Sequence, residues 1–144
     1  MTSMTWMTSM TSSLALRAVL ALLAVYHLAI GVVSVSSLTL TARVTARLYG
    51  IVVGESPQLR YAVRMLGLYA LALGALLALA AWRPSEHREV IAVVCALQLA
   101  RAGCRVLFRD ELTAAFRVPA RRNAVGAALL VAEAAVLAVC FPRA

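Results

Sequence analysis

The sequence predicts an all-α integral membrane protein, a four-transmembrane-helix bundle with a short interfacial helix between the first and second membrane-spanning helices. Three observations predict it: 63% of the 144 residues are hydrophobic, only 14% are charged, and the charges leave four long apolar stretches. A soluble domain has about 25% charged residues and does not expose so much apolar surface. Each stretch is close to the ~20 residues that cross a bilayer. We therefore treat residues 1–144 as one membrane domain.

Helix-breaking residues separate the four stretches. Pro57, Pro84 and Pro142 each lie where an apolar run begins or ends, because proline interrupts the interior of a helix. Ser85, just before the third run, is a candidate N-cap. The predicted membrane-spanning helices cover residues 14–36, 59–82, 87–108 and 123–141.

The two longer connections differ in character. In residues 38–58, Arg43 and Arg47 stand four apart with apolar residues on a neighbouring face, which predicts a short helix lying in the membrane interface. Residues 109–122 contain Asp110, Glu111 and Pro119, and we expect a polar loop there.

The basic residues predict how the chain lies in its membrane. Lys and Arg total 14 against 6 acids, a formal charge of +8; all 14 are arginines, and they cluster at the ends of apolar runs. This placement favours orientation signals over nucleic-acid binding, so no nucleic-acid partner is expected. Nine arginines accompany the two longer connections and four lie on the opposite side, which predicts that the longer connections face the cytoplasm and both termini lie outside. Arginine usage with abundant Ala, Val and Leu indicates a GC-rich bacterial genome and hence a bacterial inner membrane, and we expect no cleaved signal peptide.

Polar residues inside the predicted membrane segments form the candidate site. Gln98, Arg101 and Arg105 fall at i, i+3 and i+7 and therefore share one stripe of the third helix. Glu133 lies in the fourth helix at a similar depth. An arginine at the bilayer centre costs about 2.5–3.5 kcal/mol on insertion scales, so we predict that Arg101 pairs with Glu133 inside the bundle. His27, near the middle of the first helix, is expected to join them.

Several roles remain open for His27. It can serve as a structural hydrogen-bonding group, take part in proton or ligand chemistry, or ligate a metal or haem. The other histidine, His87, lies at the opposite end of the depth scale, so the sequence offers no paired axial ligands and no metal or cofactor is predicted. Cys95, Cys104 and Cys140 lack redox or zinc spacing and are expected to be small buried apolar residues.

Two further residue sets point to contacts. Small residues repeat every four positions in the second and fourth helices, which is typical of close helix packing. These residues are Ala70, Gly74 and Ala78, and Ala124, Ala128 and Ala132. Five arginines next to the longer connections are candidates for binding anionic lipid head groups or a partner, with orientation signalling as the alternative. They are Arg60, Arg64, Arg117, Arg121 and Arg122.

The segment RMLGLYALALG from Arg64 to Gly74, followed by an apolar run to Trp82-Arg83-Pro84, resembles the DoxX-like four-helix membrane proteins. The segment YHLAIG from Tyr26 to Gly31 fits the same likeness. The resemblance covers most of the chain in layout and implies a four-helix membrane fold. That group includes a membrane subunit associated with quinone-linked sulfur oxidation, but the resemblance assigns no catalytic residue here.

The resulting functional prediction is a small polytopic membrane protein that acts as an accessory or assembly subunit or as a self-associating bundle. Its expected partners are the lipid bilayer and either a membrane protein or further copies of itself. No specific catalysis is predicted, since the chain has no phosphate loop, no serine-hydrolase elbow and no Cys-x-x-Cys. The alternatives are an ion- or proton-coupled transporter or channel for small solutes that uses the intramembrane Arg/Glu/His layer, and a quinone-linked membrane redox subunit.

Overall fold

A computed structural model describes residues 3–49 and 56–142, with side chains for residues 14–47 and 56–142. The described residues form six helices and no strand. The helices are α1 (Ser3–Ser36), α2 (Leu38–Tyr49), α3 (Pro57–Trp82), α4 (Arg88–Leu107), α5 (Arg109–Phe116) and α6 (Ala120–Val139). Four stretches of helix are long and apolar enough to cross a membrane, namely Leu14–Ser36 within α1 and the whole of α3, α4 and α6. The predicted all-α, four-helix class with a short helix between the first two is therefore confirmed.

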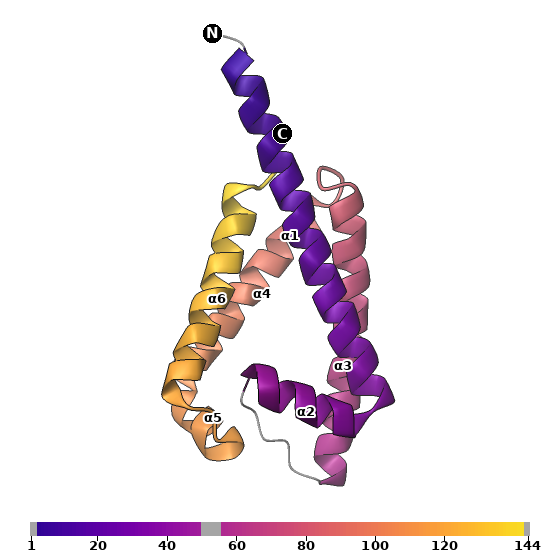
Figure 1. Ribbon diagram of the computed structural model, residues 1–144, viewed down its shortest axis with the longest axis vertical. Coiled ribbons are helices and arrows are strands. Elements are labelled where there is room, and N and C mark those ends of the chain that lie inside the picture. Colours follow the sequence, from indigo (N-terminus) through magenta and orange to yellow (C-terminus); the bar gives the residue numbers. More distant parts are fainter. Residues whose placement is uncertain (1–2, 50–55, 143–144) are drawn as a thin grey trace.

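The four long helices form two antiparallel pairs (Figure 1). The α1–α3 contact is the most extensive in the molecule, and the α4–α6 contact is the next. The pairs approach each other at the end where a short turn joins α3 to α4, and they diverge toward the other end, where α2 and α5 lie. Helix α2 runs across the wider end and contacts both α1 and α6.

The apolar core lies at the narrow end, where the two pairs meet. All four long helices contribute to it, and most of its side chains are large aliphatic residues. Packing and dispersion hold such a core together in a bilayer, because lipid tails are as apolar as leucine. Its buried members are Leu16, Leu20, Leu23, Ala24, Leu77, Ala80, Ile91, Val94 and Leu137.

Glycines allow α1 and α3 to approach closely. A Cβ atom added at Gly67 of α3 would lie 2.8 Å from the Cβ of Ser34 on α1. One added at Gly74 would lie 2.9 Å from the backbone nitrogen of Leu28, and one at Gly31 would lie 2.9 Å from the carbonyl oxygen of Gly67. No larger residue fits at these three positions without moving the helices apart.

The small-residue prediction is therefore confirmed at Gly74, whereas the repeat in the fourth helix does not pack against another described helix of this chain. Gly74 is buried against α1, whereas Ala124, Ala128 and Ala132 are all exposed on α6. The repeat of four residues marks a face of the helix, but it does not say whether that face meets the same chain.

Helix ends explain most differences from the predicted boundaries. Helix α3 begins at Pro57, and the Ser56 hydroxyl caps it by accepting a hydrogen bond from the Leu59 amide at 3.1 Å. Ser85 was the wrong residue for the α4 cap: the N-cap position is His87, and its side chain makes no capping bond. The turn is instead held by the exposed ion pair between Arg83 and Glu86, at 3.2 Å.

The polar connection at residues 109–122 is not simply a loop, because it contains α5. Asp110 and Glu111 lie in the first turn of α5, where acidic side chains interact favourably with the helix dipole. The helix ends at Phe116, and the C-cap residue Arg117 adopts the left-handed conformation with φ 53°. Residues 50–55, which complete the other long connection, lie outside the described part of the chain.

Candidate functional site

Gln98 is the centre of the polar cluster. It lies on α4, is 2% exposed, and uses both ends of its side-chain amide. Its Nε2 donates to Oε2 of Glu133 on α6, and its Oε1 accepts a hydrogen bond from Nη1 of Arg101 at 3.1 Å. The amide therefore links α4 to α6 and joins a cation to an anion within the bundle.

The predicted direct pair between Arg101 and Glu133 is wrong, because Gln98 lies between them. Among residues 14–47 and 56–142, the ion pairs within 4 Å are Arg83–Glu86 and Arg109–Asp110, both on the surface. The charge of Arg101 still acts electrostatically on Glu133 and on His27. Matching depths along two helices correctly placed the charges in one layer, but depth does not specify which side chains touch.

His27 lies beside this cluster. It is 6% exposed on α1, and its Nδ1 is 2.8 Å from the carbonyl oxygen of Leu23, one turn earlier. Since a carbonyl only accepts, Nδ1 carries the proton and donates it. The neighbouring Tyr26 ring meets the imidazole edge-on, with ring centroids 5.0 Å apart. These contacts give His27 a hydrogen bond and an aromatic neighbour within its own helix.

Arg105 makes a second link between α4 and α6. Its Nη1 donates to Oδ1 of Asn123 at 3.1 Å, and Asn123 Nδ2 donates back to the Arg105 carbonyl oxygen at 2.7 Å. The guanidinium lies over Gly126, where an added Cβ would be 2.8 Å from Nη1. Asn123 was not among the predicted site residues. A lone amide near the start of an apolar helix, with a glycine three residues later, is a sequence signal for the hydrogen-bond partner of a buried arginine.

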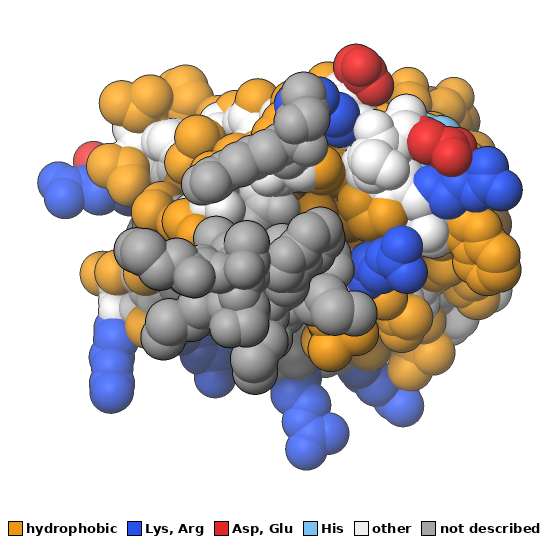
Figure 2. Space-filling model, turned by 90° about the horizontal axis from the view of Figure 1, so that it is seen from above, with side chains coloured by type: hydrophobic (Ala, Val, Ile, Leu, Met, Phe, Trp, Pro, Cys, Tyr) orange, Lys and Arg blue, Asp and Glu red, His pale blue; other side chains and the backbone are white. Residues whose placement is uncertain are grey.

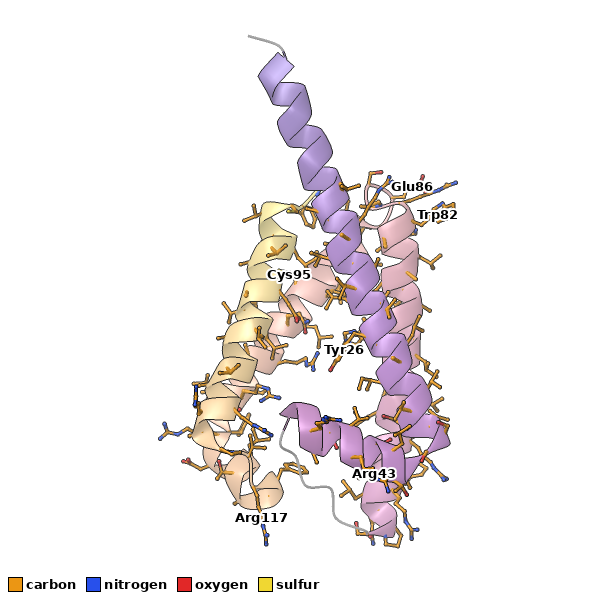
Figure 3. All side chains as sticks on the ribbon, viewed as in Figure 1. Tyr26, Arg43, Trp82, Glu86, Cys95 and Arg117 are labelled. Atoms are coloured by element: carbon orange, nitrogen blue, oxygen red, sulfur yellow. The ribbon has the colours of Figure 1, made fainter. Side chains whose placement is uncertain are left out.

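A cavity of about 490 Å³ adjoins these side chains, between α1 on one side and α4 and α6 on the other. Its wall is mostly apolar, and the polar side chains of the cluster form one part of it. Figure 3 shows Tyr26 pointing from α1 into the space between the two helix pairs. The lining residues are Val19, Leu22, Leu23, Tyr26, Gln98, Arg101, Arg105, Gly126, Leu129, Leu130 and Glu133.

The five arginines predicted to meet lipid or a partner are all exposed, on the first turns of α3, the end of α5 and the first turns of α6. Arg122 also donates through Nη1 to the carbonyl oxygen of Ala46, at 3.4 Å, and so connects α6 to α2. Elsewhere the surface is strongly apolar: Figure 2, viewed from the end at which α1 begins, shows hydrophobic side chains around the flanks and charged ones in small groups.

No group of three or more metal-ligating side chains occurs among the described residues. Within that same part of the chain, Cys95, Cys104 and Cys140 are all unpaired. Cys104 is exposed, contrary to prediction, whereas the Cys95 thiol donates to the carbonyl oxygen of Ala134 at 3.4 Å and adds a contact between α4 and α6.

Fold and site together indicate a multi-pass helical membrane protein whose two helix pairs enclose a polar cluster and a cavity. Comparison with protein-family models, with curated proteins and with solved structures gave no match to this chain. The likeness to DoxX-like proteins therefore stays a prediction.

Proposed function

We propose that the protein is a non-enzymatic membrane bundle that acts as an accessory or assembly subunit, either with another membrane protein or with further copies of itself. The observation that carries the proposal is the hydrogen-bond network centred on Gln98. Both ends of this amide are occupied by side chains of the same chain, which favours a role in fixing helix register over one in chemistry.

The exposed face of α6 supports assembly. Ala124, Ala128 and Ala132 repeat every four residues and are all exposed. Small side chains at this spacing let a second helix approach closely within a membrane, where close packing is a main source of association. The α6 helix is itself held to α4 through Gln98 and Asn123, so this face is presented on a fixed support.

Native mass spectrometry from nanodiscs tests the proposal. We expect the chain to be detected in a defined complex, either with copies of itself or with a distinct membrane protein. The variant Ala128→Leu should lose that complex because the added side chain separates the helices, whereas Ala75→Leu, at an exposed position on α3, should keep it. A monomer alone in the unmodified protein would contradict the proposal, and co-purified quinone would favour a redox subunit.

A second candidate function is transport of a small solute, because a cavity with charged side chains in its wall lies within the membrane-spanning part. Glu133 is the acid in this wall. In proteoliposomes, Glu133→Gln should reduce proton-coupled solute flux about tenfold if the carboxylate takes part, whereas Glu86→Gln, in the exposed turn, should not change it. Equal flux in vesicles with and without the protein excludes this function.

The proposal also includes the membrane in which the protein lies and its orientation there. A bacterial inner membrane, with the α2 and α5 end in the cytoplasm and both termini outside, is supported by the arginines exposed at that end. Arg105 does not contribute to the charge bias as counted from the sequence, because its guanidinium is turned into the bundle over Gly126. Arg143, counted on the opposite side, lies outside the described residues. The remaining arginines keep the same bias.

A further inference from the structure

The cavity between α1 and the α4–α6 pair has a wall whose charges balance. Arg101 and Glu133 carry opposite charges that act on each other, and Gln98 bonds to both of them. Arg105 also reaches this wall, but it is bonded to Asn123 and interacts elsewhere in the protein as well, so it is not a free cation. A balanced wall favours an uncharged ligand, because a charged one would leave an uncompensated charge within the membrane.

The polar part of the wall can both donate and accept hydrogen bonds. A guanidinium carries five N–H groups and a carboxylate has two oxygens, whereas the bonds to Gln98 use one nitrogen of Arg101 and one oxygen of Glu133. Both charged side chains are only partly buried, and Tyr26 brings a hydroxyl from α1 to the same cavity (Figure 3). Lipid tails cannot satisfy these groups, whereas a head group with a hydroxyl and a carbonyl can.

The polar groups lie deep in the membrane-spanning part of the chain. Gln98 is halfway along α4, which runs from Arg88 to Leu107. At this depth a strongly hydrated head group such as a phosphate would have to give up its water, and the cost of burying a charge is high. A small uncharged head group therefore fits the site better.

The rest of the wall fits one apolar chain. Leu22 of α1 and Leu129 of α6 belong to the wall and are 73% and 59% exposed, so the cavity is continuous with the outer surface that meets lipid. At about 490 Å³, it falls within the range of roughly 300–1,000 Å³ that is typical of small-molecule sites, which combine mostly apolar walls with a few polar groups. A lipid can enter such a site from the side.

We propose that this cavity binds a neutral single-chain lipid of the monoacylglycerol kind, with its head group at Arg101 and Glu133 and its chain along the leucines of α1 and α6. A hydroxyl of the head group donates to the Glu133 carboxylate, and the ester carbonyl accepts from the Arg101 guanidinium. The site does not depend on the assembly proposal, since it is formed within one chain.

Photocrosslinking in phosphatidylcholine nanodiscs tests this site, with a 1-monoacylglycerol that carries a diazirine and an alkyne in its chain as the probe. We expect saturable labelling of the α1 and α6 peptides that line the cavity, and unlabelled 1-oleoylglycerol should displace it. Arg101→Gln should weaken this labelling about tenfold, because a hydrogen bond to a charged group is lost. Labelling of the outer face of α3 at Leu66, which is 65% exposed, should neither saturate nor be displaced.

Two further variants make the labelling specific to the cavity. Leu129→Trp, at an exposed position of the wall, should block the cavity while the fold is retained, as checked by circular dichroism and gel filtration. This variant decides the question if Arg101→Gln does not pass the same check. Arg83→Gln, in the exposed turn between α3 and α4, is the matched control and should be labelled as the unmodified protein is.

Competition with related lipids identifies the head group. Methyl oleate keeps the chain and the carbonyl but has no donor, and oleate has the same chain with a negative charge. Both should displace the probe about tenfold more weakly than 1-oleoylglycerol does. The proposal is overturned if either of them displaces the probe equally well, if the cavity labelling does not saturate, or if a folded wall variant is labelled as strongly as the unmodified protein.

Discussion

At the scale of single residues, Gln98 shows how a neutral side chain can organise two charges. An amide offers a donor at one end and an acceptor at the other, so it can serve a carboxylate and a guanidinium together. Here the donor faces Glu133 and the acceptor faces Arg101. Loss of this one side chain therefore removes an internal partner from both charged groups.

We expect Gln98→Leu to destabilise the bundle by about 1–2 kcal/mol, the upper part of the range for hydrogen bonds between membrane helices. Reversible unfolding in mixed maltoside and dodecyl sulfate micelles, followed by circular dichroism, measures the change. Gln58→Leu, at an exposed position in the first turn of α3, should have little effect. Equal stability of the two variants would show that the network contributes nothing to folding.

The sequence predicted the members of this cluster but not its bonds. Gln98, Arg101 and Arg105 lie on one stripe of α4 because of helical periodicity, and a charged residue in a membrane segment must turn away from lipid. Which atom meets which depends on the rotation of α6 about its axis. Nothing in a single chain's spacing encodes that rotation, and for this reason the Arg101–Glu133 contact was misassigned.

At the scale of helices, the two pairs use different means of association. Helices α1 and α3 approach closely through glycines, and Gly67 lies directly against Ser34. Helices α4 and α6 are joined by polar side chains, through the Gln98–Glu133 and Arg105–Asn123 contacts. Composition predicted the four helices correctly because 20-residue apolar runs have few other stable forms in a bilayer.

Glycine substitutions test the first means of association. Gly67→Ala should destabilise the protein by about 1–3 kcal/mol, because the new Cβ would lie 2.8 Å from that of Ser34. The matched control is Gly103→Ala in α4, where an added Cβ meets nothing within 4 Å. That change should be neutral or stabilise the helix by about 0.5–1 kcal/mol. Thermal unfolding in detergent separates the two outcomes, and a similar loss in both variants would argue against close α1–α3 packing.

Helix boundaries were predicted less well than the helices themselves. Helix α5 was missed because its eight residues are too few to show a clear apolar face, and its sequence reads as polar. The Ser56 cap lies directly before Pro57, a pairing that is typical of helix starts. Pro57 was interpreted only as a helix-breaking residue, so the start of α3 was predicted two residues too late.

At the scale of the whole molecule, the charge distribution gives a testable orientation. Arginines are exposed on α2, on the first turns of α3 and α6, and on α5, all at the wider end of the bundle. We expect an alkaline phosphatase fused after residue 144 in a bacterial host to be active, since this enzyme folds only outside the cytoplasm. A green fluorescent protein fused at the same position should be dark. An inactive phosphatase fusion and a fluorescent protein fusion would show the opposite orientation.

The divergence of the two helix pairs has a consequence for the surrounding lipid. Because the molecule broadens from the α3–α4 turn toward α2 and α5, it occupies more area in one leaflet than in the other (Figure 1). An inclusion of conical profile is accommodated with less elastic deformation where the bilayer bends toward its wide end. Such a shape would concentrate the protein in membrane regions whose curvature matches its own, with no partner required to direct it there.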